Sequence, residues 1–301
     1  METNIIKISD KLYLIGLFPL ISGFEDFIGA WLYKGEKNIL IDVGPQVTAE
    51  SLLESLKNMG VTKIDYILLT HIHIDHAGGI GIISENFPNA SIILHSSGIP
   101  HIADPVRIQE GTIKTLGNIG KSYGPFTPVQ ADRLVDASKI NNNYFKTIFT
   151  PGHAPHHISY MIDEYLFAGE ASGVYINIHN NEFYLRPATP TKFMLETSIK
   201  SIDNLIAENP KTICFGHFGI NESAIKMLKK YREQLLNWHK IISKEVKRSE
   251  NKDLIHICLE KLLHEDIFLK NFINLENAKK NRERIFLQNS IKGFLDFIIN
   301  R

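Results

Sequence analysis

The chain lacks the features that mark a membrane protein, a disulfide-stabilised protein or a cysteine-based metal site. Only two of its 301 residues are cysteine, Cys214 and Cys258, which are too few and too widely spaced for a disulfide framework or a thiolate metal site. No apolar run approaches the ~20 residues that cross a bilayer. Residues 1–10 also lack a basic segment followed by an apolar one. We therefore expect a cytoplasmic protein that does not bind membranes.

An excess of charge of one sign is also missing. Lys and Arg together number 33, as do Asp and Glu, so no global field attracts nucleic acid. The one basic cluster, residues 279–284, is interrupted by Asn281 and Glu283 and is typical of a solvated helix face. A hydrophobic fraction of 44% is enough for a substantial core. We expect a globular protein with a small-molecule substrate and no nucleic-acid partner.

The densest chemistry in the chain lies in residues 71–76, directly after the apolar run 67–69. This segment contains three imidazoles and a carboxylate, from His71, His73, Asp75 and His76. Their nitrogen and oxygen atoms are donors that borderline divalent metals accept. Side chains two residues apart in extended backbone point the same way, so the first two histidines can hold one ion together. The last two donors are offset and would face a second ion or the water between two ions.

Three further donors follow predicted strands elsewhere in the chain. His153 comes after the apolar run 145–149, Glu170 follows Phe167, Ala168 and Gly169, and His217 follows the run 211–214. Each donor precedes a loop of small residues, which is how a rigid sheet presents side chains at one edge. These residues are candidates to complete the metal site.

The order and spacing of these donors resemble the metallo-β-lactamase superfamily over roughly residues 10–220. In that family a His-x-His-x-Asp-His cluster precedes a His, a bridging Asp and a last His. The resemblance implies two divalent metal ions, with zinc expected and iron or manganese as alternatives. The implied ligands are His71, His73 and His153 for the first ion, and Asp75, His76 and His217 for the second.

Glu170 stands where the family usually has the bridging Asp. One extra methylene moves the carboxylate by about 1.5 Å. The bridge therefore either contacts one ion only or holds two ions that lie further apart. We expect Glu170 to contact at least one ion.

Within the family, the segment Thr150–His157 (TPGHAPHH) is similar to hydroxyacylglutathione hydrolase (glyoxalase II) and lactonase-like members. This similarity implies a dinuclear hydrolase that acts on an ester, thioester or lactone through a metal-bound hydroxide. Asp75 would orient the hydroxide and pass its proton to the leaving group. The alternative is an iron-dependent oxidoreductase similar to persulfide dioxygenases on the same fold. His73 argues against the diiron electron-transfer branch, where a Glu usually stands.

Several polar residues near the donors have two interpretations each. His157 either orients His153 or its turn, or is a structural histidine, and Asp42 either bonds a ligand imidazole or caps a turn. Tyr175, His179 and Arg186 follow Glu170 in a segment predicted to lie above the metals. They are candidates to contact a substrate carbonyl or carboxylate, with ordinary hairpin positions as the alternative.

The apolar patterns predict an α+β fold, and the resemblance implies a four-layer αβ/βα sandwich. Runs 27–33 and 38–43 predict a hairpin, followed by a helix that Thr48 caps and Gly60 ends. Another helix is expected from about residue 192 to residue 207.

From Asn221 onward the pattern becomes helical, with apolar residues three and four apart. We therefore predict a catalytic domain over 1–220 and a helical C-terminal extension over 221–301. The extension either packs on the catalytic domain or on a second copy in a homodimer, or it forms a lid or substrate-selecting wall. Its histidines, His239, His256 and His264, are expected to bind no metal.

Overall fold

The computed structural model describes residues 4–178, 182–248 and 253–300, so His179 lies outside the described residues. The chain forms two compact units, Met1–Thr147 and Ile148–Arg301. This division differs from the boundary predicted at residue 220, because the C-terminal helices share a core with the strands that precede them. The proposed split into a catalytic domain and an extension stays a prediction.

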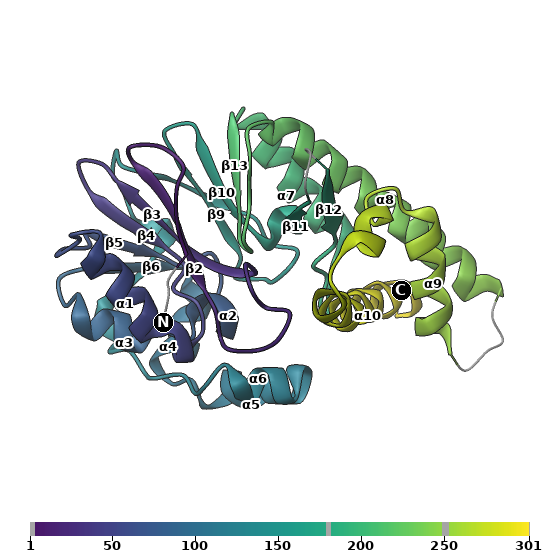
Figure 1. The fold of residues 1–301 in the computed structure, drawn as a ribbon, viewed down its shortest axis with the longest axis horizontal. Helices are drawn as coiled ribbons and strands as arrows, with labels where there is room; N and C mark the ends of the chain where they lie inside the picture. The colour runs from purple at the N-terminus through teal and green to yellow at the C-terminus, as the bar shows by residue number, and fades with distance from the viewer. Residues whose placement is uncertain (1–3, 179–181, 249–252, 301) are drawn as a thin grey trace. The chain divides into compact units, whose positions relative to one another are not determined.

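The first unit contains one seven-stranded sheet whose strands follow the order of the sequence. Neighbouring strands are antiparallel from β1 to β4 and parallel from β4 to β7. The strands are β1 (Ile5–Lys7), β2 (Leu12–Leu17), β3 (Ile28–Lys34), β4 (Asn38–Ile41), β5 (Tyr66–Leu68), β6 (Ser91–Leu94) and β7 (Leu134–Asp136). The helices are α1 (Ala49–Asn58), α2 (Ile74–Ala77), α3 (Ile80–Asn86), α4 (Ile99–Ala103), α5 (Val106–Leu116) and α6 (Asn118–Ser122), as Figure 1 shows.

Two local details of the first unit differ from the sequence expectations. The predicted hairpin forms from β3 and β4, but β4 ends at Ile41 because Asp42 takes a left-handed backbone conformation with φ of 56°. Thr48 does precede α1, but its side chain makes no capping bond. Its hydroxyl donates to the Pro45 carbonyl at 2.9 Å, so the predicted cap is wrong in its chemistry.

The second unit contains a five-stranded sheet and a separate two-stranded hairpin. The sheet has the order β14-β13-β10-β9-β8, and β10 and β13 are parallel. Its strands are β8 (Lys146–Phe149), β9 (Ile158–Ile162), β10 (Tyr165–Gly169), β13 (Thr212–Phe215) and β14 (Ile220–Asn221). The hairpin joins β11 (Val174–Asn177) to β12 (Phe183–Arg186). The helices are α7 (Leu195–Ala207), α8 (Ala224–Arg248), α9 (Leu254–Glu265) and α10 (Asn277–Ile299).

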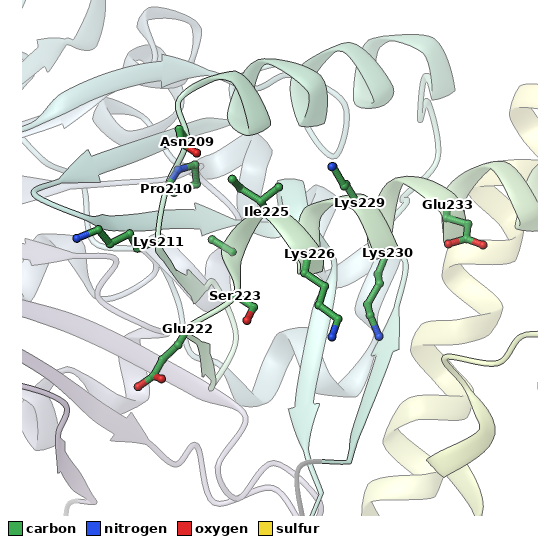
Figure 2. Close-up of a pocket in the computed structure, with 11 residues that line it drawn as sticks. Asn209, Pro210, Lys211, Glu222, Ser223, Ile225, Lys226, Lys229, Lys230 and Glu233 are labelled. Carbon is green, nitrogen blue, oxygen red and sulfur yellow. The ribbon is translucent and has the colours of Figure 1, made fainter.

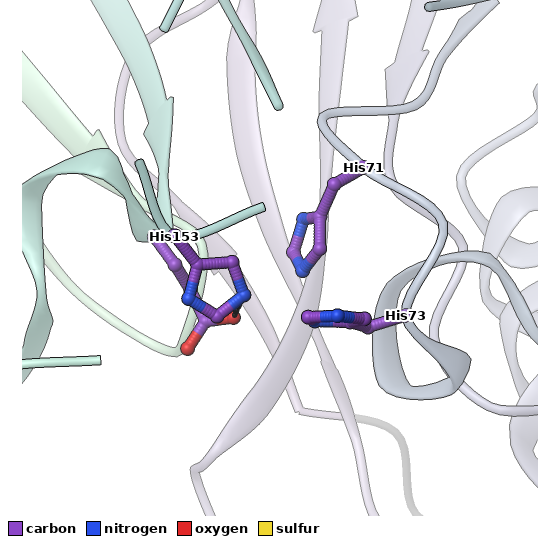
Figure 3. A group of neighbouring side chains, drawn as sticks. His71, His73 and His153 are labelled. Carbon is purple, nitrogen blue, oxygen red and sulfur yellow. Dashed lines mark ion pairs between the residues drawn. The ribbon is translucent and has the colours of Figure 1, made fainter. Parts of the chain in front are cut away.

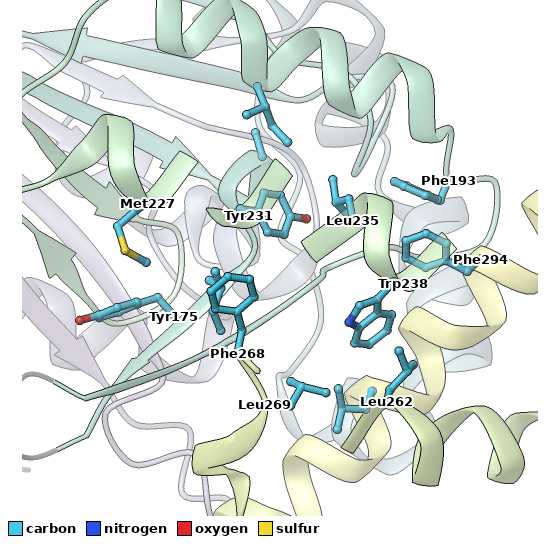
Figure 4. Packing of buried hydrophobic residues seen from close by; sticks show 14 of the residues in the cluster. Tyr175, Phe193, Met227, Tyr231, Leu235, Trp238, Leu262, Phe268, Leu269 and Phe294 are labelled. Atoms are coloured by element: carbon cyan, nitrogen blue, oxygen red, sulfur yellow. The ribbon is translucent and has the colours of Figure 1, made fainter. Parts of the chain in front are cut away.

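The predicted C-terminal helices are present, and they pack inside the second unit. Trp238 of α8 is fully buried, and its ring lies 5.7 Å from that of Phe294 of α10 (Figure 4). Its indole N–H donates to Asp266. The same apolar cluster includes Ile213 and Phe215 of β13. Burial of large aromatic side chains is a major contribution to stability, so α8 and α10 stabilise the sheet of this unit. No helix in the described part of the chain is long and apolar enough to cross a membrane.

Candidate functional site

The first unit supplies four candidate ligands, His71, His73, Asp75 and His76, called here the first donor set. The first two lie in the loop that follows β5, and the last two lie in the short helix α2. His71 and His76 are each 1% exposed, whereas His73 and Asp75 are half-buried. The ring of His71 lies 4.6 Å from that of His73 (Figure 3) and 4.3 Å from that of His76. One loop and one helical turn thus gather three imidazoles.

A buried carboxylate orients two of these imidazoles. Asp42 accepts hydrogen bonds from the Thr70 N–H and O–H, both at 2.8 Å, and from Nδ1–H of His76 at 2.9 Å. Because the Thr70 hydroxyl hydrogen goes to Asp42, its oxygen accepts from Nδ1–H of His71 at 3.0 Å. The network therefore assigns the proton to Nδ1 of both rings and leaves Nε2 with its lone pair. Of the two roles predicted for Asp42, the structure shows the bond to an imidazole.

The second unit supplies His153, Glu170 and His217, called here the second donor set. They follow β8, β10 and β13, respectively. The Glu170 carboxylate lies between the two rings, with Oε2 at 2.9 Å from Nε2 of His153 and Oε1 at 3.2 Å from Nε2 of His217. Nδ1 of His153 lies 2.8 Å from the Ala188 carbonyl oxygen. A carbonyl can only accept, so this ring also carries its proton on Nδ1 and presents Nε2.

His157 supports the second donor set through Glu170. Its Nε2 accepts the backbone N–H of Glu170 at 3.0 Å, and its Nδ1–H therefore faces the Thr150 hydroxyl at 2.9 Å. The His157 backbone closes the turn around His153 by bonding Thr150 and Ala154. The predicted contact with this turn is thus made both by the backbone and by the bond from Nδ1 to Thr150, while the contact with Glu170 was missed. No sequence signal links these residues, because they meet only when β9 and β10 pair.

A glycine allows the chain to bring His153 to this position. Gly152 has φ of 147°, a conformation that L side chains rarely adopt, and an added Cβ would lie 2.3 Å from Oγ of Ser198. Any other residue would strain the turn and push α7 away. The Thr-Pro-Gly-His pattern is therefore explained by backbone geometry as well as by the ligand at its end.

Two of the predicted substrate residues lie in the interior of the second unit. Tyr175 is 5% exposed and stacks on Phe215 with ring centroids 4.6 Å apart. Arg186 is 2% exposed and donates to the Glu283 carboxylate and to the Pro187 carbonyl. Burial alone would lower the pKa of the Arg186 guanidinium, but the neighbouring Glu283 carboxylate raises it above its usual value. These positions favour packing roles, and contact with substrate stays a prediction for both residues.

A surface hollow of the second unit contains none of the donors. It lies at the start of α8, and its lining includes Lys226, Lys229, Lys230 and Glu233 (Figure 2). Burial and the neighbouring Lys226 ammonium lower the pKa of Lys230, whose ammonium lies 4.7 Å from the centre of the Phe183 ring. Lysines outnumber the two carboxylates, Glu222 and Glu233, among its charged lining residues, and no histidine or cysteine is among the described residues that line it.

Both donor sets fit borderline divalent metal ions. They contain only imidazole nitrogen and carboxylate oxygen, and three rings have Nδ1 held by an acceptor so that Nε2 is the donor atom. Such outer hydrogen bonds are typical of metal-binding histidines. Among the described residues, the groups of side chains able to hold a metal include none of His239, His256 and His264.

Comparisons with known proteins agree with this chemistry. The chain is 26% identical over 240 residues to the metallo-β-lactamase fold-containing protein ST1585 of Sulfurisphaera tokodaii, which covers 75% of this chain and 86% of that protein. The crystal structure of ST1585 matches with a TM-score of 0.71 at 22% identity, over 96% of this chain and 99% of that one.

Two further relatives match shorter regions. The probable metallo-hydrolase MJ0888 of Methanocaldococcus jannaschii is 30% identical over 156 residues, which covers 52% of this chain and 72% of that protein. The hydroxyacylglutathione hydrolase of Serratia proteamaculans is 30% identical over 155 residues, which covers 50% of this chain and 49% of that protein. This chain therefore spans about half the length of the latter relative.

The sequence profile of the metallo-β-lactamase superfamily matches residues 25–217, a region that contains every residue of both donor sets. The fold predicted from the sequence is confirmed: the chain belongs to the metallo-β-lactamase superfamily and has its α+β fold with additional C-terminal helices.

Proposed function

We propose that this protein is a hydrolase that uses two divalent metal ions to cleave an ester, a thioester or a lactone. The ligand sets are those that the family resemblance implies. They are His71, His73 and His153 for one ion, Asp75, His76 and His217 for the other, and Glu170 on one or both. The observation that carries the proposal is the fixed tautomer of three of these imidazoles, each of which presents Nε2.

The residues of the chain divide the work of such a reaction. When bound, the ions would lower the pKa of a water toward ~7 and polarise the substrate carbonyl. Asp75 is half-buried, and its Oδ2 lies 3.9 Å from Nε2 of His76, so its carboxylate stands beside the ligands. It would accept the proton of the attacking water and deliver it to the leaving group. Asp42 and Thr70 would keep two ligand rings in the tautomer that binds metal.

The substrate class rests on similarity to the hydroxyacylglutathione hydrolases and on the Thr150–His157 segment. Zinc is the expected metal. Iron and manganese are the alternatives, because they also accept nitrogen and oxygen donors. A small-molecule substrate, a homodimer and a cytoplasmic location stay predictions of the sequence.

Elemental analysis of the purified protein, followed by assays on lactones, thioesters and phosphodiesters, tests the proposal. We expect close to two equivalents of metal and turnover of a lactone, an ester or a thioester that a chelator abolishes. Iron with oxygen consumption on a persulfide would instead support the oxidoreductase alternative. Protein that contains no stoichiometric metal after preparation with an ample metal supply would refute the proposal.

A further inference from the structure

One face of helix α10 lies along residues 186–192 of its own unit. The face carries Glu283, Phe286, Ser290, Gly293 and Asp296, whose spacings of three and four place them in one row along the helix. Arg186 donates to Glu283 and lies with its guanidinium 5.0 Å from the centre of the Phe286 ring. At the other end of the segment, the Lys192 N–H donates to Asp296 at 3.1 Å.

Ser290 binds the residues on either side of Ala188. Its hydroxyl donates to the Pro187 carbonyl at 2.8 Å, and its Oγ accepts the Thr189 N–H at 3.5 Å. The Ser290 carbonyl accepts the Thr189 hydroxyl at 3.0 Å. Ser290 is 3% exposed, so water does not compete strongly for these bonds. Ala188 is thus held from both neighbours, and its carbonyl is the acceptor for Nδ1–H of His153 at 2.8 Å.

Gly293 lets the helix approach this segment closely. An added Cβ would lie 2.0 Å from the Thr189 carbonyl oxygen and 2.6 Å from that of Pro190, both of which are backbone atoms. No side chain fits there without moving the helix or the segment. The contact between α10 and residues 187–190 is therefore made by a matched serine and glycine, one turn apart.

We propose that α10 is a positioning element for the metal ligand His153. Ser290 and Gly293 fix the Ala188 carbonyl, and this carbonyl fixes the tautomer and ring orientation of His153. The inference rests on the proposed function, because it concerns how well His153 binds metal. It gives the C-terminal helix a role beyond packing, although α10 contributes no ligand of its own.

The test measures zinc affinity in the full-length protein after metal removal, by competition with a chromophoric chelator. Ser290→Ala should weaken one zinc equivalent by about 10-fold and leave the other within about twofold, since loss of an outer hydrogen bond typically costs 10–100-fold. Cys258→Ala is the matched control because Cys258 is fully buried in the core on α9. It should lower the thermal midpoint without changing either affinity.

A second readout follows the ring proton itself. In the zinc-loaded wild type, Nδ1–H of His153 should give an NMR signal protected from exchange, and Ser290→Ala should speed its exchange at least fivefold. If Ser290→Ala does not fold, Thr189→Val takes its place in the test, because this variant removes one of the same hydrogen bonds. Unchanged zinc affinity with an unchanged ring-proton signal would overturn the inference and leave the proposed function standing. A wild type that binds no zinc would overturn both.

Discussion

The two donor sets are built in different ways. The first donor set occupies residues 71–76 of one loop and one short helix, and side chains orient its rings. Asp42 bonds His76 directly and orients His71 through the Thr70 hydroxyl. The second donor set is spread from residue 153 to residue 217 on three strand ends, where a backbone carbonyl orients His153 and the His157 side chain holds the backbone of Glu170. A compact motif supported by one carboxylate is visible in the sequence. A dispersed set whose supporting groups lie far from the donors in the sequence depends on how the whole unit packs.

This difference has a consequence for mutation. In the first unit, one side chain, Asp42, holds three hydrogen bonds, so a single substitution removes the support. In the second unit the acceptor for His153 is the backbone carbonyl of Ala188, which no side-chain substitution can remove. Its position changes only through neighbours such as Ser290. We therefore expect a single substitution to weaken metal binding directly in the first unit, and substitutions to weaken it by degrees in the second.

The largest effect should come from Asp75→Asn in the first donor set. An amide cannot take up the proton of the attacking water, and general acid–base groups typically contribute 10²–10⁴-fold. We expect kcat/KM to fall at least about 100-fold, while the thermal midpoint stays close to that of the wild type. Asp132→Asn is the control, since Asp132 is exposed in the same unit. Full activity in the Asp75 variant would remove this residue from the mechanism.

Glu170→Ala should have the next largest effect, on the second donor set. Its carboxylate lies within 3.2 Å of the donor atoms of His153 and His217, so both rings lose a neighbour. We expect one metal equivalent to be lost preferentially, from the site that His217 shares with Asp75 and His76 in the proposed ligand sets.

Elemental analysis after dialysis measures this loss in Glu170→Ala. Glu164→Ala, at an exposed turn of the same unit, is the control and should keep both equivalents. Two equivalents held at wild-type affinity in Glu170→Ala would show that the carboxylate binds no metal.

Much of the fold was predictable because it depends on local patterns. The run 71–76 was identified from donor chemistry, and the helices α8, α9 and α10 from apolar residues three and four apart. The boundaries were less predictable. Helix α7 begins at Leu195, later than expected, and Lys192 before it has φ of 70°, which no helix accommodates.

The supporting contacts of the site were not predictable from local pattern. Arg186 and Glu283 lie 97 positions apart in the sequence, and the Ala188 carbonyl has no side-chain signal at all. Arg186 and Tyr175 were predicted either to contact substrate or to occupy ordinary hairpin positions. Their burial follows from strand pairing and from aromatic stacking that only the tertiary structure reveals. Sequence thus indicated the donors, and packing decides what holds them.

Asp42→Asn should weaken metal binding by the first donor set. The amide nitrogen would face two donors, so His76 would shift its proton to Nε2 to accept from it, and that tautomer cannot bind metal through Nε2. We expect metal affinity to fall about 10- to 100-fold, measured by chelator competition. Asp136→Asn is the control. Asp136 accepts hydrogen bonds from the N–H and the hydroxyl of Ser138 in the same unit, and these bonds involve no residue of either donor set. Equal losses in the two variants would contradict the role of Asp42.

Glu283→Gln should have the smallest effect on the metal centre and act on stability instead. Burial alone would raise the pKa of the Glu283 carboxyl, but the guanidiniums of Arg186 and Arg282 lower it below its usual value. A carboxyl with a lowered pKa binds fewer protons in the folded than in the unfolded chain. The contribution of this carboxylate to stability is therefore complete above its pKa in the unfolded chain, about 4.3, and is lost as pH falls through its pKa in the folded chain.

At pH 7 the Gln variant leaves two buried guanidiniums without their carboxylate, and the free energy of unfolding should fall by about 3 kcal/mol. This gap in unfolding free energy between variant and wild type should shrink as pH drops below about 4, because the unfolded wild-type chain binds a proton there that the folded chain binds only at lower pH. Denaturant unfolding at a series of pH values measures this gap. Glu276→Gln, at an exposed position before α10, is the control and should show almost no gap at any pH. A gap in the Glu283 variant that stays constant down to acid pH would show that its charge is not what stabilises the pair.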